Sequence, residues 1–196
     1  FSDLHHLVWM VNDFGEQEAV ARALHDWSQL EVEILENEGT YSSLIRTLSA
    51  LQDPHRKVAV ILTSAYLLKP FPDHHQIEQA IQRLKVGDEI SPVDLFESLI
   101  EAGYEVSEDP YLEPGFYLRH GDVLDVFPIN SLYPYRVEFD FETISAIYTY
   151  DQTTQIKIHE TKSVIIYPLK EIEAKSSLWD FLGEGTLFVE DELDLG

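Results

Sequence analysis

The sequence lacks cysteine and is poor in positive charge. None of its 196 residues is cysteine, which excludes disulfide bonds, thiol catalysis and cysteine-ligated zinc. The chain has 13 Lys and Arg residues against 36 Asp and Glu residues, so its formal net charge is −23. Proteins bind nucleic acids largely through Lys and Arg side chains that displace counterions from the phosphates. The composition therefore argues against direct DNA binding by this chain.

Long apolar runs are also missing. The longest runs, such as residues 58–62 and 164–167, are far shorter than the roughly 20 residues that a membrane helix needs. No signal-peptide pattern opens the chain. We therefore expect a soluble, cytoplasmic protein without a membrane partner. The chain begins at Phe1 rather than at Met and stops at Gly196 after an acidic stretch, so we expect a segment of a longer protein.

The first third of the sequence alternates strand-like and helix-like patterns. Residues 7–11, 30–34 and 57–62 are predicted strands, and residues 15–27 and 41–51 are predicted helices. Short strands separated by helices are typical of a parallel sheet. Asp13 is the expected N-cap of the first helix. The apolar face of that helix is predicted to contain a spaced set of side chains: Val20, Ala23, Leu24 and Trp27.

The pattern changes near residue 85. Residues 86–118 contain many acids but no Lys or Arg, and Ser91, Pro92 and Asp94 predict a capped helix that ends at Gly103. Four antiparallel strands are predicted after Gly115, rich in Val, Ile, Phe and Tyr: residues 116–127, 135–139, 144–150 and 156–158.

We therefore predict an α/β fold in which a small α+β domain of antiparallel strands, residues 86–158, is inserted into a parallel α/β layer. The layer consists of residues 1–85 and a return segment, residues 159–196. Two later strands, residues 164–167 and 186–189, are candidates for pairing with the first sheet.

No catalytic or cofactor site emerges from the sequence. No glycine is followed by lysine, so the phosphate-binding loop of a nucleotidase is absent. Residues 186–192 resemble a magnesium-binding strand end, which leaves a nucleotidase using Asp191 and Glu192, or a hydrolase using other acids, as a minor hypothesis. The neighbouring histidines, His5 with His6 and His74 with His75, diverge on a strand or helix and predict no metal site. We therefore predict no enzyme activity, cofactor or metal in this chain.

Three strings of residues, taken together, resemble a known domain. They are LKVGDEISPVDLFESLIEAGYE from Leu84, GFYLRHGDVLDVFPI from Gly115, and YPYRVEFDFETISAIYTYDQTTQ ending at Gln155. This combination resembles the middle domain shared by the excision-repair helicase UvrB and the transcription-repair coupling factor (Mfd), and it is strongest between Leu84 and Gln155. The strings around Arg136 and from Asp151 to Gln155, with the upstream helix 43–51, favour the coupling-factor family.

The resemblance implies a non-catalytic module that binds UvrA and recruits it to stalled RNA polymerase. It also implies that residues 1–85 are a degenerate helicase-like (RecA-like) layer without a phosphate loop. RNA polymerase and DNA would then be contacted only by other parts of the parent protein.

The family's UvrA contacts map unevenly onto this sequence. Arg136 matches one contact arginine, whereas the other falls on His120, with Arg119 one place earlier. A contact phenylalanine falls on Asp140, between Phe139 and Phe141. A one-residue slip would restore the phenylalanine only with a β-bulge, because the slip reverses the face of each side chain.

These substitutions leave open an alternative, in which a regulatory or adaptor module with the same fold docks on other domains of its own chain or on a different partner. If UvrA does bind, the charge that histidine gains near pH 6.5 predicts tighter binding at lower pH through His120.

Overall fold

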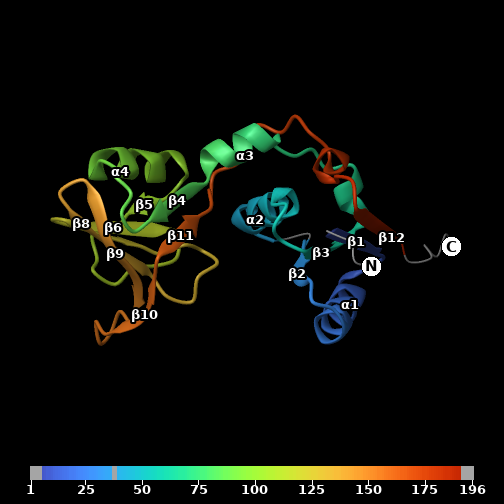
Figure 1. Ribbon diagram of the computed structural model, residues 1–196, viewed down its shortest axis with the longest axis horizontal. Helices are drawn as coiled ribbons and strands as arrows, with labels where there is room; N and C mark the ends of the chain where they lie inside the picture. Colours follow the sequence, from blue (N-terminus) through green and yellow to red (C-terminus); the bar gives the residue numbers. More distant parts are fainter. Residues whose placement is uncertain (1–5, 37–38, 191–196) are drawn as a thin grey trace. The chain divides into compact units, whose positions relative to one another are not determined.

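The computed structural model describes residues 6–36 and 39–190 and divides into two compact units. One unit is formed by residues 1–78 together with 172–196, and the other by residues 79–171. The second unit is therefore an insertion between two parts of the first, as Figure 1 shows by the order of its colours. Within the described residues, no helix is long and apolar enough to cross a membrane.

The first unit contains a four-stranded sheet with the order β12-β1-β3-β2, in which neighbouring strands run parallel. Its strands are β1 (His6–Val11), β2 (Glu31–Ile34), β3 (Val58–Thr63) and β12 (Thr186–Glu190). Its helical elements are α1 (Phe14–Trp27), α2 (Tyr41–Gln52), η1 (Ser64–Leu67), η2 (Leu178–Phe181) and most of α3 (His74–Ala80). The predicted parallel α/β layer is confirmed, and so is the pairing of residues 186–189 with the first sheet.

The central strand β3 is buried along its whole length, which explains its nearly continuous apolar sequence. Asp13 caps α1 as predicted, because its carboxylate accepts a hydrogen bond from the Glu16 N–H at 3.0 Å. The predicted apolar face of α1 is wrong in part: Trp27 is 89% exposed and Ala23 is also exposed, whereas Gln17 is fully buried. The Gln17 side-chain nitrogen donates to the Leu35 carbonyl at 3.1 Å and is thereby satisfied, whereas its buried Oε1 has no hydrogen-bond partner.

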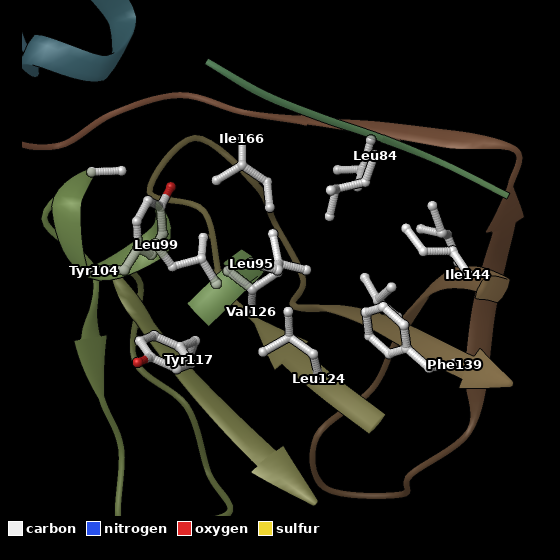
Figure 2. Close-up of a cluster of buried hydrophobic side chains, with 14 residues drawn as sticks. Leu84, Leu95, Leu99, Tyr104, Tyr117, Leu124, Val126, Phe139, Ile144 and Ile166 are labelled. Carbon is white, nitrogen blue, oxygen red and sulfur yellow. The ribbon is translucent and has the colours of Figure 1, made fainter. Parts of the chain in front are cut away.

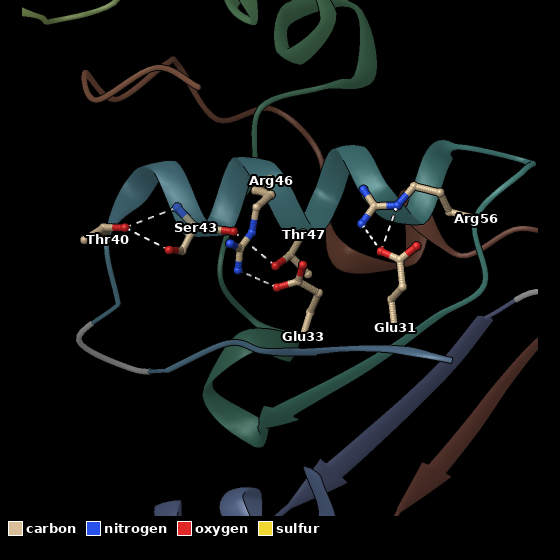
Figure 3. A network of polar contacts seen from close by, with 7 residues as sticks. All are labelled: Glu31, Glu33, Thr40, Ser43, Arg46, Thr47 and Arg56. Carbon is tan, nitrogen blue, oxygen red and sulfur yellow. Dashed lines mark hydrogen bonds and ion pairs between the residues drawn. The ribbon is translucent and has the colours of Figure 1, made fainter. Parts of the chain in front are cut away.

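Two ion pairs connect the edge strand β2 to neighbouring elements of the first unit (Figure 3). The Arg46 guanidinium on α2 lies 2.6 Å from the Glu33 carboxylate. Arg56, in the turn before β3, pairs with Glu31. Both glutamates are on β2, so two of the few cations in the chain serve to hold an edge strand.

The second unit contains a six-stranded sheet with the order β10-β9-β8-β7-β6-β5. Its strands are β5 (Glu105–Val106), β6 (Phe116–His120), β7 (Val123–Val126), β8 (Tyr135–Asp140), β9 (Thr143–Tyr150) and β10 (Lys157–Thr161). The pairs from β6 to β10 are antiparallel, as predicted, and only β5–β6 is parallel.

One face of this sheet is covered by α4 (Pro92–Glu101) and packs into an apolar core. Figure 2 shows Leu95 and Leu99 of α4 among Leu124, Val126 and Phe139 of the sheet. Residue Ser91 is the N-cap of α4 and Pro92 begins it, but the predicted capping box is absent because the Ser91 side chain makes no capping hydrogen bond. After α4 the chain turns at Gly103, whose φ of 96° suits glycine.

The strand at residues 164–167 does not return to the first sheet. Instead, β11 (Ser163–Ile166) pairs antiparallel with β4 (Gln82–Lys85) in a separate two-stranded sheet of the second unit. The reason is burial, because Leu84, Val164 and Ile166 all belong to the core under α4. The compact second unit accordingly extends from 79 to 171, beyond the predicted span of 86–158 at both ends.

Candidate protein-binding surface

Five of the six predicted contact residues are divided between the two faces of the second sheet, and the sixth, Phe141, lies in a turn. Side chains alternate between the two faces of a strand, so Arg119 and His120 of β6 point in opposite directions. The Arg119 guanidinium lies 4.9 Å from the ring centre of Phe96 on α4, and Phe139 belongs to the core. Arg119 and Phe139 are thus on the face covered by α4, whereas His120, Arg136 and Asp140 are on the opposite face, called the open face below.

Arg136 is held by a buried carboxylate on the open face. Its Nε and one Nη atom each donate to Asp125, at 2.7 Å, in a bidentate pair. The Asp125 side chain is 2% exposed and that of Arg136 is 21% exposed. The Tyr150 hydroxyl donates to the same carboxylate at 2.9 Å, and the Arg136 guanidinium lies 4.3 Å from the Tyr150 ring centre.

The consequence is that Arg136 fulfils a structural role before any partner arrives. The hydrogen bonds from Arg136 to Asp125 raise the pKa of the guanidinium, so it remains a cation. Its charge, however, is matched by that of Asp125 on the neighbouring strand. Asp125, which sequence reasoning missed, has a recognisable signal: it is an acid between Leu124 and Val126 in an apolar strand, where burial requires a partner.

The turn after β9 explains the string from Asp151 to Gln155. The Asp151 carboxylate accepts from the backbone N–H of Thr154 at 2.7 Å and from its hydroxyl at 2.8 Å. Gln155 then accepts from Arg136 at 3.2 Å and donates to the Gln152 carbonyl at 2.8 Å. The string therefore forms a turn that completes the surroundings of Arg136.

The rest of the open face is acidic. The Tyr148 hydroxyl donates to Glu138 at 2.5 Å, and the Lys157 ammonium lies 4.2 Å from the Tyr148 ring centre. Lys157 also pairs with Glu160 at 3.0 Å. His120 and Asp140 are exposed at the edge of this network. A partner approaching this face would therefore meet carboxylates and paired cations.

Phe141 stands apart from both faces, at the tip of the β8–β9 hairpin. Asp140 pairs with Thr143, so Phe141 and Glu142 form a two-residue loop. Phe141 has a φ of 58° and is 89% exposed. That backbone region is uncommon for a bulky side chain and is normally occupied by glycine.

The hairpin is anchored by the segment before α4. The Ile90 N–H donates to the Glu142 carbonyl at 2.8 Å, and the Ile144 N–H donates to the Asp88 carbonyl at 2.9 Å. A bulge does occur in this hairpin, but its extra residue is Ser145 on β9. Strand β8 therefore keeps its alternation, and Phe141 is exposed because it is a turn residue rather than because the strand slips.

The described residues contain no group of three or more His, Asp or Glu side chains placed to hold a metal ion. Asp191, Glu192 and His5 lie outside the residues that the structure describes. What the second sheet presents is an exposed aromatic tip and an acidic open face, a surface suited to binding a protein.

The second unit is similar in sequence to a known protein domain. Residues 82–172 match the family model described as the UvrB interaction domain. This segment coincides closely with the second unit, residues 79–171. The second unit is thus similar in sequence to the UvrB interaction domain.

The relatives come from two kinds of repair protein. The chain is 28% identical over 162 residues to the transcription-repair-coupling factor of Escherichia coli, which covers 82% of this chain and 14% of that protein. It is 28% identical over 147 residues to that of Haemophilus influenzae, covering 74% and 13%. UvrABC system protein B of Fervidobacterium nodosum is 29% identical over 116 residues, covering 59% and 17%. The chain thus spans less than a fifth of the length of these relatives.

Proposed function

We propose that this chain is the UvrA-binding module of a transcription-coupled nucleotide excision repair factor, and that it recruits UvrA to stalled RNA polymerase in the cytoplasm. The matches to two transcription-repair-coupling factors cover 162 and 147 residues, more than the 116 residues of the match to UvrABC system protein B of Fervidobacterium nodosum, which favours the coupling-factor family over UvrB. Residues 1–85 then represent a degenerate helicase-like layer. DNA and RNA polymerase are contacted by other parts of the parent protein.

The observation that carries this proposal is the aromatic hairpin tip. Phe141 adopts a backbone conformation that glycine would occupy at no cost, yet its ring is 89% exposed and makes no ring contact in the described structure. Backbone strain that no contact within the fold offsets indicates that the residue has a role outside the fold. We assign Phe141 as the apolar anchor for UvrA, with His120 and Asp140 as neighbouring polar contacts and Arg136 as a positioning residue.

The experiment is a calorimetric titration of purified UvrA into the chain and into Phe141→Ala. Loss of an aromatic anchor commonly costs about 2 kcal/mol, or roughly 30-fold in affinity. Leu68→Ala is the matched control, because Leu68 is 92% exposed and belongs to the first unit. Absence of binding by the unmodified chain would refute UvrA recruitment, and equal losses in the two variants would refute the role of Phe141.

A second candidate function is an adaptor that has kept the fold and changed its partner. It is favoured by the pairing of Arg136 with buried Asp125, because a neutralised arginine offers a partner little charge. His120 and Asp140 also differ from the family pattern. Affinity purification of the tagged parent protein from its native host distinguishes the two, since recovery of UvrA alone would count against the adaptor.

A further inference from the structure

Three loops meet at the end of the second sheet that lies opposite the β8–β9 hairpin. The Leu112 N–H donates to the Gln152 side chain at 2.5 Å, and that side chain donates back to the Leu112 carbonyl at 3.0 Å. The Tyr150 N–H donates to the Pro134 carbonyl at 3.3 Å. The loop before β6, the loop before β8 and the β9–β10 turn are thereby held next to one another.

Each loop exposes large apolar side chains. Tyr111 is 59% exposed, Leu132 is 90% exposed and Ile156 is 65% exposed, and Tyr133, next to Leu132 in the sequence, is 42% exposed. We call these four residues the loop-end patch. Single exposed apolar residues are common, whereas several on adjoining loops are typical of an interaction site.

The loops that carry the patch are ordered by their own hydrogen bonds. The Tyr111 N–H donates to the Asp109 carboxylate at 2.8 Å, and the Ser107 hydroxyl donates to the Asp109 carbonyl at 2.8 Å. The Ser131 hydroxyl donates to the Tyr133 carbonyl at 2.6 Å. A patch on preorganised loops loses little conformational entropy when a partner binds, so these exposed side chains are suited to recognition.

The charges around the patch have one sign. Glu108 and Glu113 flank Tyr111 in the sequence, and Asp151 begins the β9–β10 turn. Hydrogen bonds from the Thr154 backbone and hydroxyl lower the pKa of Asp151, so its carboxylate is ionised at neutral pH. Two cations of the same sheet are already paired, Arg136 with Asp125 and Lys157 with Glu160. None of these three rim carboxylates forms an ion pair within the described part of the chain.

We propose that the loop-end patch binds a cationic protein segment with both apolar and Arg or Lys side chains. The apolar side chains pack on Leu132 and Ile156. The cations lie against the rings of Tyr111 and Tyr133 and pair with the acidic rim, because aromatic faces and carboxylates both attract guanidinium groups. This site is separate from Phe141, since the eight residues of β9 place the two ends of the sheet about 24 Å apart.

The test uses two fluorescent 12-residue peptides, one of alternating Leu and Arg and one of alternating Leu and Glu. Binding to the whole chain is measured by anisotropy at physiological salt, which screens attraction beyond roughly 8 Å. We expect the Arg peptide alone to bind. The double variant Tyr111→Ser with Leu132→Ser should bind the Arg peptide at least tenfold more weakly than the unmodified chain. The separate double variant Glu108→Gln with Glu113→Gln should also bind it at least tenfold more weakly.

Two control variants separate the site from the general acidity of the chain. Glu97→Gln with Glu101→Gln removes the same charge from α4, and Leu68→Ser removes an exposed apolar side chain from the first unit. Each should change affinity less than twofold. Equal weakening by the control and patch variants, equal binding of the Glu peptide, or no binding of the Arg peptide would overturn the proposal. UvrA plays no part in these measurements, so their result is independent of the proposed function.

Discussion

The two ends of the second sheet each contain a non-glycine residue with positive φ, and the two are used differently. Phe141 has a φ of 58° in the β8–β9 hairpin, and Gln155 has a φ of 59° after β9. The Gln155 side chain bonds to Arg136 and to the Gln152 carbonyl, so the strain is offset by contacts inside the fold. Phe141 is 89% exposed. The comparison shows that Arg136, which matches the family motif, is already bound within the fold, while the turn residue is available to a partner.

The largest expected effect is at the Arg136 end. Arg136→Ala leaves the Asp125 carboxylate, 2% exposed, without its cation, and breaking a buried ion pair from one side typically costs about 3–5 kcal/mol. The free energy of unfolding, measured by urea denaturation, should fall by that amount. A decrease below about 1 kcal/mol would show that Arg136 is free to serve a partner.

The control for this prediction replaces both partners. Arg136→Met together with Asp125→Leu removes the unpaired charge and should recover part of the lost stability, because apolar pairs can replace buried ion pairs at little cost. Recovery is incomplete because the buried Tyr150 hydroxyl then lacks its acceptor. A lower UvrA affinity of Arg136→Ala alone could result either from a lost contact or from partial unfolding of the variant. The double variant should bind UvrA normally if Arg136 is only a positioning residue.

A smaller effect is expected from Tyr150→Phe at the same end. The substitution removes the hydroxyl that donates to Asp125 at 2.9 Å, and hydrogen bonds to charged groups contribute about 1.5–3 kcal/mol. Burial, followed by the negative charge of Asp125, raises the pKa of Tyr150 above its ordinary value. Because the folded pKa is raised, this stabilisation is complete below pH 10 and is lost as the pH rises further.

Urea denaturation at pH 8 and at pH 11 tests this sign. The unmodified chain should lose more stability between the two pH values than Tyr150→Phe does. Tyr104, whose pKa is also raised by burial, provides the background, because it titrates in both proteins. If the free energy of unfolding fell by the same amount between these two pH values in both proteins, the role given to Tyr150 would be contradicted.

Much of the fold could be predicted because its signals are local. The buried run at residues 58–62 and the cap at Asp13 depend on neighbouring residues alone. The pairing of β11 with β4 could not be predicted, because Val164 suits the core of either sheet and only tertiary packing decides between them. Trp27 was misassigned for a similar reason: Gln17, a polar residue, occupies the buried position by bonding to the Leu35 carbonyl.

The candidate site was less predictable than the fold. The motif match identified Arg136, but its partner Asp125 lies on another strand, 11 residues away in sequence. Adjacent predicted contacts, such as Arg119 and His120, separate onto two faces as strand alternation requires. The exposure of Phe141 depends on its place in a two-residue turn. The amino-acid sequence alone does not specify which residues form that turn.

The smallest effect distinguishes the two ends of the sheet most clearly, because substitution by glycine should raise the free energy of unfolding at one end and lower it at the other. Glycine adopts positive φ without strain. Phe141→Gly should therefore raise the free energy of unfolding by about 0.5–1 kcal/mol while abolishing the anchor for UvrA. Gln155→Gly relieves similar strain but removes the hydrogen bonds to Arg136 and Gln152, so it should lower stability by a similar amount.

Phe141→Ala is the matched control, since alanine keeps the strained Cβ and should leave stability nearly unchanged. If Phe141→Gly destabilised the chain in urea, the phenylalanine ring would have a role within the fold, and the case for an external partner at the hairpin tip would be lost.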